Sequence, residues 1–346
     1  MTTPLLELRH VGMQFPRKSQ LMRRVIGWVR AVDGVDLVIN SGETVGLVGE
    51  SGSGKTTLGR IALGTLDPTD GQLFLEGAPV TGLSGAARSA VRRKLQFVFQ
   101  DPYSSLDPYS PVGESVAEPM RTHGTHDRAA RTARVSELFG LVGLDSDAVS
   151  RYPREFSGGQ LQRIAIARGL ALDPKVIVLD EPVSSLDVST QAEVINLLGD
   201  LQRLTGVAYL FISHDLAVVE HVSNRIAVMY LGRIVEQGDR RAVVDSPKHP
   251  YTLALLSAAP GWTSADGSGR ERIILRGDLP SPASKIDGCR FNSRCPFAME
   301  MCRTVEPLPY SAPDGTVVEC HLHTAGPQLA GASVAELALP TASRSV

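Results

Sequence analysis

The chain has 346 residues, of which 42% are hydrophobic and 21% charged, a composition typical of a globular protein with room for a large domain and a smaller one. Its formal net charge of −2 gives no electrostatic reason to expect a nucleic-acid partner. No apolar run reaches the roughly 18–20 residues that span a bilayer. The start, MTTPLLELRH, carries acidic Glu7 and lacks the apolar core of a signal peptide. We therefore expect a soluble, cytosolic chain without a transmembrane segment.

The first predicted elements are two strands, at 5–11 and 32–39. Between them, PRKSQLMRRVIGWVR repeats apolar residues at helical spacing among basic ones. Two alternatives fit this pattern. One is a short basic amphipathic element that touches lipid headgroups or a membrane partner. The other, which we favour, is a long hairpin loop folded on its own domain.

The stretch 49–57, GESGSGKTT, fits the phosphate-binding pattern G-x-x-x-x-G-K-[ST]. Its glycines let successive amides turn toward one point. Lys55 can reach the β- and γ-phosphates, and the hydroxyl of Thr56 stands where Mg²⁺ would bind. A strand at 44–49 precedes the loop, and a helix at 55–63 follows it with its N-terminus toward the phosphates. The predicted ATP-binding residues of this loop are Gly49, Ser51, Gly52, Ser53, Gly54, Lys55, Thr56 and Thr57.

A short apolar strand at 97–99 ends at Gln100, whose amide can reach a metal or a water near a bound phosphate. Residues 128–142 have the apolar periodicity of a helix. The sequence FSGGQ at 156–160 then begins another helix. Its exposed amides, dipole and serine hydroxyl make a second anion-binding end, which suggests docking on another subunit's nucleotide. A capped helix start explains the serine but gives no reason for the two glycines.

Two further strands end in polar side chains. Residues 175–181, KVIVLDE, end in Asp180, which can hold Mg²⁺, and in Glu181, which can orient or deprotonate the attacking water. Asp187 precedes a helix with apolar residues at helical spacing. The strand at 207–212 ends at Ser213 and His214. In a parallel sheet the ends of these strands share one edge, so His214 is a candidate γ-phosphate sensor.

All four cysteines lie near the C-terminal end, at Cys289, Cys295, Cys302 and Cys320. Because cytosolic disulfides are rare, four thiolates point to a tetrahedral zinc site or an iron–sulfur cluster. The spacings lack the usual C-x₂-C pairs, and four inert buried thiols are the third alternative. His321 and His323 could substitute for a ligand or support one.

Together these motifs resemble the ATP-binding subunit of an ABC transporter. The resemblance assigns the Walker A loop to 49–56, the Q-loop to Gln100 and Walker B to 176–180. It makes Glu181 the catalytic carboxylate, Asp187 the D-loop residue and His214 the switch histidine. The signature residues are Ser157, Gly158, Gly159 and Gln160, in FSGGQ where many relatives have LSGGQ. Phe15 takes the place of the aromatic residue that stacks on adenine, and Thr56, Gln100 and Asp180 are the implied magnesium ligands.

Longer stretches resemble the peptide/oligopeptide importer branch, which nickel importers share. They include VFQDPYSSLDPYSPVGESVAEP, EPVSSLDVSTQAEVINLL and the C-terminal GCRFNSRCPFAMEMC. The sequence QDPYSSLDP is most similar to that of the dipeptide/oligopeptide "F"-type ATPase subunit. The branch implies a [4Fe–4S] cluster on the four cysteines, with zinc as the alternative.

The resemblance also implies an architecture. We expect an α/β P-loop NTPase of the RecA-like ABC ATPase fold at 1–245, with an α-helical subdomain at about 102–165. A small Cys-containing C-terminal extension at 246–323 and a disordered tail at 324–346 follow. The implied cofactors are ATP and Mg²⁺.

The implied partners are a second homologous ATPase packed head to tail, two transmembrane permease subunits and an extracytoplasmic solute-binding protein. The chain would be peripheral, on the cytoplasmic face of the cell membrane. It would power the import of di- or oligopeptides. Nickel or another small solute is the alternative cargo, and a soluble non-transport ABC ATPase is the alternative class.

Overall fold

The computed structural model describes residues 3–18, 24–258, 275, 280, 286–326 and 329–337. The chain divides into two compact units that are discontinuous in sequence. The first unit comprises Met1–Arg9, Asp36–Val45 and Thr56–Ser213. The second comprises His10–Val35, Gly46–Lys55 and His214–Val346, so it contains both the glycine-rich loop and the C-terminal region.

Parallel strands form the centre of the first unit. β6 (Leu95–Val98), β7 (Val176–Asp180) and β8 (Ala208–Ser213) lie side by side, with Val176 paired to Leu95 on one side and to Ala208 on the other. Every residue of β7 and β8 is buried, as the continuous apolar runs predict for strands covered on both faces. This arrangement brings the residues after β6 and β7 to one edge of the sheet.

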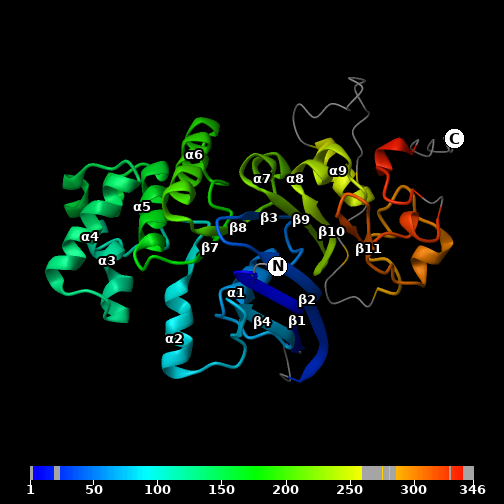
Figure 1. The fold of residues 1–346 in the computed structure, drawn as a ribbon, viewed down its shortest axis with the longest axis horizontal. Helices are drawn as coiled ribbons and strands as arrows, with labels where there is room; N and C mark the ends of the chain where they lie inside the picture. The colour runs from blue at the N-terminus through cyan, green and yellow to red at the C-terminus, as the bar shows by residue number, and fades with distance from the viewer. Residues whose placement is uncertain are drawn as a thin grey trace. The chain divides into compact units, whose positions relative to one another are not determined.

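A group of helices in the first unit carries the segment FSGGQ. α3 (Val112–His123), α4 (Arg128–Leu141) and α5 (Gly158–Leu170) pack on one another, with the short 3₁₀ helices η1 (Ser146–Ser150) and η2 (Pro153–Glu155) between α4 and α5 (Figure 1). The predicted helix at 128–142 is confirmed with its end shifted by one residue. Asp127 caps α4 by accepting a hydrogen bond from the amide of Ala130 at 2.8 Å.

The other elements of the first unit are α2 (Gly85–Lys94), α6 (Val188–Thr205) and the hairpin of β4 (Asp70–Leu75) with β5 (Ala78–Pro79). The helix α1 (Lys55–Ala62) begins at the last residue of the glycine-rich loop. The loop is preceded by β3 (Thr44–Val48), which is buried along its whole length. The predicted strand–loop–helix order around the loop is confirmed.

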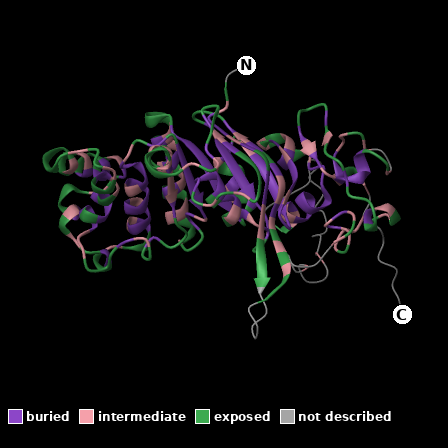
Figure 2. Ribbon diagram, turned by 90° about the horizontal axis from the view of Figure 1, so that it is seen from below, coloured by how far each residue is buried: buried purple, intermediate pink, exposed green. Residues whose placement is uncertain are grey.

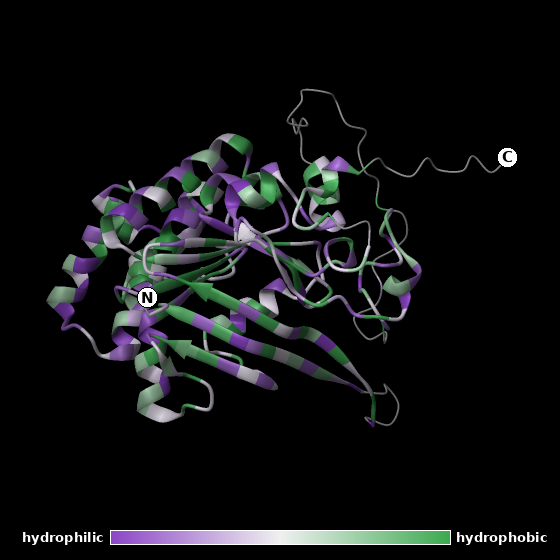
Figure 3. Cartoon of the chain, turned by 45° about the vertical axis from the view of Figure 1, so that its right-hand side comes forward, coloured by the Kyte–Doolittle hydropathy of each residue, from purple (hydrophilic) through white to green (hydrophobic). Residues whose placement is uncertain are grey.

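The N-terminal sheet corrects one prediction. Its strands run in the order β2-β1-β4-β5, and β1 (Leu6–Lys18) and β2 (Val25–Ile39) are much longer than predicted. The amphipathic alternative at helical spacing is wrong where the structure describes this stretch, because 25–30 is strand. Residues 19–23 lie outside the described part. Valine, isoleucine and tryptophan favour strands, and purple and green bands alternate along these strands in Figure 3.

The outer part of this hairpin exposes apolar side chains. Val25, Ile26 and Trp28 are 51%, 60% and 55% exposed, and this end appears green in Figure 2. The hairpin alternative for this stretch is therefore the correct one.

The second unit contains an antiparallel sheet. β9 (Arg225–Tyr230) and β10 (Arg233–Asp239) form a hairpin whose turn, Leu231 and Gly232, has positive φ at both residues, as a tight two-residue turn requires. The sheet continues through β12 (Val317–Val318) to β11 (Tyr310–Ser311). The helices of this unit are α7 (Leu216–Val222), α8 (Arg240–Asp245) and α9 (Pro250–Ala258), with η3 (Glu300–Arg303), η4 (His321–His323) and η5 (Val334–Glu336).

The C-terminal region packs into this unit through its own apolar cluster. Leu253 of α9 meets Val318, Cys320, Leu322 and Val334 there. Val334 is fully buried and its amide donates to the carbonyl of Pro247 at 2.9 Å. The disordered tail predicted at 324–346 is therefore wrong for 329–337, because this segment has buried apolar contacts. Residues 338–346 lie outside the described residues.

No helix in the described part of the chain is both long and apolar enough to cross a membrane.

Candidate nucleotide-binding and hydrolysis site

The glycine-rich loop has a backbone that only glycine fits at two positions. A Cβ on Gly49 would lie 2.1 Å from the carbonyl oxygen of Met229. A Cβ on Gly54 would lie 2.1 Å from that of Ala31, and Gly54 also has φ +108°. Gly52 has positive φ as well, and Ser51 is exposed at the outer turn of the loop. The loop is thus a tight, close-packed turn before α1.

Two polar side chains of the loop, Lys55 and Ser53, are placed where they could bind an anion. The Lys55 ammonium is buried and donates to the carbonyl oxygens of Gly49 at 2.7 Å and Glu50 at 3.0 Å. The hydroxyl of Ser53 is fully buried and has no hydrogen-bond partner among the described residues. A buried hydroxyl without a partner costs free energy, and a phosphate oxygen would satisfy it. These two groups therefore fit a bound phosphate chain.

Two oxygen ligands for a hard cation meet in the first unit. The Thr56 hydroxyl lies 3.4 Å from the Asp180 carboxylate, which ends β7 and is buried. Hydroxyl and carboxylate oxygens are ligands that Mg²⁺ prefers. Thr57, next along α1, is half-buried. The structure thus brings together two of the residues expected to bind magnesium, Thr56 and Asp180.

The carboxylate after β7 meets the amide after β6. Gln100 Nε2 donates to Glu181 Oε2 at 2.9 Å. Glu181 has φ +49°, unusual for a residue other than glycine, and its amide donates to the carbonyl of Ile212 on β8 at 2.9 Å. Backbone strain of this kind occurs at functional sites when the surroundings enforce it. Here the strained backbone directs the Glu181 side chain toward Gln100.

The signature segment is a capped helix start. The Ser157 hydroxyl accepts from the Gln160 amide at 3.3 Å, and the Gln160 side chain accepts from the Ser157 amide at 3.0 Å. Helix packing accounts for one of the two glycines that helix capping alone leaves unexplained. A Cβ on Gly159 would lie 2.3 Å from Thr190 Cγ2, so close packing against α6 requires that glycine. Gly158 is exposed and has no comparable constraint.

Of the remaining predicted residues, Asp187 and His214 lie at the ends of elements and Phe15 lies within a strand. Asp187 caps α6, accepting from the Thr190 amide at 3.0 Å and from the Ser189 hydroxyl at 2.7 Å, and these hydrogen bonds lower its pKa. His214 follows β8 directly and is exposed. Phe15 lies on β1 with 38% of its surface exposed, in the same unit as the glycine-rich loop.

The four cysteines are free thiols in the second unit. Burial raises the pKa of Cys289 to about 11 and that of Cys295 to about 12, and it also raises the pKa of Cys320. Within the described residues, no group of three or more His, Cys, Asp or Glu side chains is placed to hold a metal ion. The predicted four-cysteine metal centre therefore has no support from this arrangement.

The two histidines near Cys320, which could have served as metal ligands, each contact a backbone carbonyl. One ring nitrogen of His321 lies 2.8 Å from the Val305 carbonyl, and one of His323 lies 2.8 Å from the Lys248 carbonyl.

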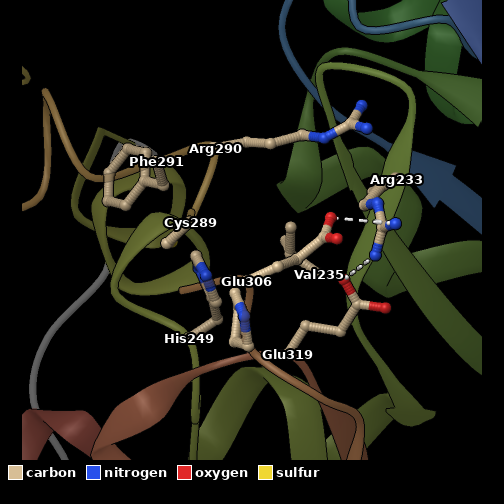
Figure 4. Close-up of a pocket in the computed structure, with 9 residues that line it drawn as sticks. Arg233, Val235, His249, Cys289, Arg290, Phe291, Glu306 and Glu319 are labelled. Atoms are coloured by element: carbon tan, nitrogen blue, oxygen red, sulfur yellow. Dashed lines mark hydrogen bonds and ion pairs between the residues drawn. The ribbon is translucent and has the colours of Figure 1, made fainter. Parts of the chain in front are cut away.

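A charged cluster near Cys289 was not predicted. Arg233 makes ion pairs with Glu306 at 2.9 Å and with Glu319 at 3.4 Å, beside a cavity of about 10 Å³ that Cys289 and Arg290 also line (Figure 4). Such a cavity has room for about one water molecule. Arg233 lies on β10, whereas its partners come from residues more than 70 positions later, so no local sequence pattern pairs them.

Comparisons with known proteins agree with this geometry. Residues 32–184 match the family model described as "ABC transporter", and 235–302 match "Oligopeptide/dipeptide transporter, C-terminal region". A solved structure of the ATP-binding cassette MJ0796, dimeric and bound to ADP and Pi, is 29% identical with a TM-score of 0.60. It covers 68% of this chain and 99% of its own. The fold and the site together define a P-loop ATPase of the ABC class.

Two similar proteins identify the family within the ABC class to which the chain belongs. The oligopeptide transport ATP-binding protein AppF of Bacillus subtilis (strain 168) is 47% identical over 92% of this chain and 98% of its own length. The probable peptide ABC transporter ATP-binding protein y4tS of Sinorhizobium fredii (strain NBRC 101917 / NGR234) is 45% identical over 98% of this chain and 96% of its own. The chain belongs to the oligopeptide/dipeptide family of ABC transporter ATP-binding proteins.

Proposed function

We propose that the chain hydrolyses ATP to power the import of di- or oligopeptides through a membrane permease. The observation that carries the ATPase role is the pair of contacts at the strand ends, Thr56 with Asp180 and Gln100 with Glu181. The cargo class is supported by the match of 235–302 to the oligopeptide/dipeptide transporter C-terminal region and by the peptide transport named in the relatives. Nickel or another small solute is the alternative cargo.

Different side chains would bind the phosphates, the magnesium ion and the adenine ring. The Lys55 ammonium leaves the Gly49 and Glu50 carbonyls to bind the β- and γ-phosphates, and the Ser53 hydroxyl bonds a phosphate oxygen. Thr56 and Asp180, with Gln100, would hold Mg²⁺, which supplies positive charge to the phosphates when bound. Phe15 contributes an aromatic face for the adenine ring.

The reaction is an attack of water on the γ-phosphorus. The new bond joins the water oxygen to phosphorus, the bond to the bridging oxygen of ADP breaks, and ADP leaves with that oxygen. Glu181 orients the water and can accept its proton, Gln100 holds the Glu181 carboxylate in place, and His214 donates to a γ-phosphate oxygen. Catalysis is thus mainly positioning and charge neutralisation.

The site is one half of a composite. Ser157, Gly158, Gly159 and Gln160 form the N-terminal end of α5 and would cap the ATP bound by a second ATPase subunit, and Asp187, which caps α6, would lie beside that junction. We place the chain at the cytoplasmic face of the cell membrane, with two permease subunits and an extracytoplasmic solute-binding protein. Our domain boundaries are 1–245 for the ATPase domain, 102–165 for its helical subdomain and 246–323 for the extension.

The four cysteines are proposed to hold a [4Fe–4S] cluster, with zinc as the alternative. Backbone amides donate toward all four sulfurs: the Met299 amide to Cys302 Sγ at 3.4 Å, and the amides of Phe291 and Asn292 to Cys289, of Phe297 to Cys295 and of Leu322 to Cys320. Such N–H donors stabilise thiolate ligands. Iron and sulfide analysis of anaerobically purified protein tests the proposal. About four of each per chain are expected, whereas stoichiometric zinc without iron would exclude the cluster, and neither metal would exclude both sites.

Transport tests the function as a whole. The chain is co-expressed with a candidate permease pair, a second ATPase and a binding protein, and the complex is placed in proteoliposomes with internal ATP. We expect ATP-dependent uptake of a labelled dipeptide that unlabelled peptides, but not Ni²⁺, compete away. Uptake of Ni²⁺ that ignores peptides would favour the alternative cargo. A chain that never co-purifies with a permease would favour a non-transport ABC ATPase.

A further inference from the structure

The C-terminal extension contacts the glycine-rich loop through a bidentate ion pair between Arg294 and Glu50. Arg294 donates from Nη1 to Glu50 Oε2 at 2.7 Å and from Nη2 to Glu50 Oε1 at 3.1 Å. Glu50 is the residue after Gly49 in the loop, and Arg294 lies 244 positions later. Both residues belong to the second unit. Paired fork-to-carboxylate geometry is the strongest form of arginine ion pair.

This ion pair is protected from water. The Arg294 side chain is only 8% exposed and the Glu50 side chain 28%. Arg294 Nη1 also donates to the Tyr230 hydroxyl at 3.5 Å, and the Arg294 guanidinium carbon lies 6.0 Å from the Tyr230 ring centroid. A pair at this depth is screened less by salt than a surface pair.

A second contact fixes the backbone of the same loop residue. The Glu50 amide donates to the hydroxyl of Tyr251, on α9, at 2.8 Å. Tyr251 is fully buried, and its ring packs against Tyr230 and Phe291, with centroids 4.7 Å and 5.5 Å away. The Glu50 amide is thus committed to the extension side of the loop. Both its side chain and its main chain are held by residues outside the loop.

Three residues of the segment 289–295, which we call the latch segment, contact other parts of the second unit. Phe291 is buried in the aromatic cluster, and Arg294 holds Glu50. Arg290 pairs with Asp33 and bonds the carbonyl of Leu231. The turn containing Leu231 in turn touches the loop, because the Gly232 amide donates to the Ser53 carbonyl at 2.8 Å.

We propose that the latch segment is a working part of the nucleotide site, in which Arg294 and Tyr251 are positioning residues for the glycine-rich loop. Glu50 places a carboxylate in the loop that must receive a polyphosphate anion. Arg294 neutralises this carboxylate and holds it away from the phosphates. The inference rests on the assignment of the loop as the ATP site. It assigns the C-terminal extension a direct influence on ATP affinity.

The negative charge of Glu50 determines whether ATP affinity rises or falls when Arg294 is replaced. Removing the Arg294 guanidinium leaves the Glu50 carboxylate uncompensated beside the triphosphate, so ATP binds more weakly. Neutralising Glu50 as well removes that repulsion. If Arg294 acted only by anchoring the loop, the double variant would bind ATP as weakly as Arg294→Gln, because both variants lack the bond between Arg294 and Glu50.

The test measures binding of a fluorescent ATP analogue with Mg²⁺ to the full chain, in wild type and in Arg294→Gln, Glu50→Gln and the double variant. We expect Arg294→Gln to raise Kd about tenfold. The double variant should return to within about threefold of wild type. Arg303→Gln is the matched control, since Arg303 is an exposed arginine of the same extension, and its Kd should equal that of wild type.

A second variant and a second readout guard against a folding defect. Tyr251→Phe keeps the ring in the aromatic cluster and removes only the hydroxyl that holds the Glu50 amide, and it should raise Kd about threefold. In thermal unfolding, Arg294→Gln should show a smaller upward shift on adding MgATP than wild type, because ligand stabilisation depends on Kd. Wild-type Kd in Arg294→Gln, or a double variant as weak as the single one, would overturn the proposal. A wild-type chain that binds no ATP would instead reject the proposed function.

Discussion

Gln100 and Glu181 are 81 residues apart in sequence, yet the Gln100 amide donates to the Glu181 carboxylate at 2.9 Å. The two residues follow the adjacent parallel strands β6 and β7, which end at the same edge of the sheet. Gln100 begins the segment that leads to α3, so we expect movement of that segment to change the contacts of Glu181, the carboxylate that we propose orients the attacking water. The contact would couple the helical part of the first unit to ATP hydrolysis.

Gln100→Ala should separate ATP binding from hydrolysis. The substitution removes the hydrogen bond that holds Glu181, while Lys55, Ser53 and Thr56 remain. We expect steady ATP hydrolysis by the assembled transporter to fall about tenfold or more, since misplacing a catalytic group by an ångström is costly. ATP affinity should change less than threefold. Equal losses of affinity and turnover would contradict a positioning role for this glutamine.

Lys55→Ala should abolish useful ATP affinity. The variant removes a buried ammonium that otherwise bonds the Gly49 and Glu50 carbonyls and the phosphates. Hydrogen bonds to charged groups contribute about 1.5–3 kcal/mol, so Kd should rise by about 10- to 150-fold. Lys94→Ala, which removes only an exposed ion pair with Glu76, is the control and should bind ATP as wild type does. Unchanged affinity in Lys55→Ala would reject the loop as the phosphate site.

The two signature glycines should respond differently to alanine. A Cβ at Gly159 would collide with Thr190 at 2.3 Å, whereas a Cβ at Gly158 would meet Leu186 Cδ2 at an ordinary 3.4 Å. Gly159→Ala should therefore destabilise the first unit by about 1–3 kcal/mol. Gly158→Ala should leave stability within about 0.5 kcal/mol of wild type. Denaturant unfolding measures both, and equal stabilities would show that α5 and α6 separate without cost.

Burial of Glu236 predicts a pH dependence of stability. Desolvation raises its pKa from 4.5 to about 7, although the Lys248 and His249 amides donate to it at 2.8 Å. An acid with a raised folded pKa stabilises the fold fully below its unfolded pKa, and this contribution is lost as the pH rises toward 7. Relative to Glu236→Gln, wild type should lose up to about 3 kcal/mol between pH 4.5 and 7. Parallel stability profiles for the two proteins would contradict this.

The local motifs could be predicted from the sequence, and the long-range contacts could not. The glycine-rich loop was recognisable because its chemistry needs fixed spacings within nine residues. Asp180 and Glu181 were recognisable because they end an apolar run that can only be a buried strand. That Gln100 bonds Glu181 depends on the order of strands, which no local pattern encodes.

Two differences from the predictions have physical causes. β1 and β2 extend beyond the predicted strands because the apolar residues of 16–30 fit both a helix and a strand, and the β-branched and aromatic residues among them favour a strand. Residues 329–337 are rich in small side chains, as disordered tails are, yet Val334 fills an apolar cluster. The role of Arg294 was missed because a basic residue between two cysteines gives no sign that it reaches Glu50.

The most direct measurement is steady ATP hydrolysis by the assembled complex carrying Glu181→Gln. The amide keeps the size and hydrogen-bonding reach of the carboxylate but cannot accept the proton of the attacking water. We predict ATP affinity within about threefold of wild type and hydrolysis reduced by about 10²–10⁴-fold, the usual contribution of a general base. Hydrolysis at the wild-type rate in this variant would contradict the assignment of Glu181 as the residue that activates water.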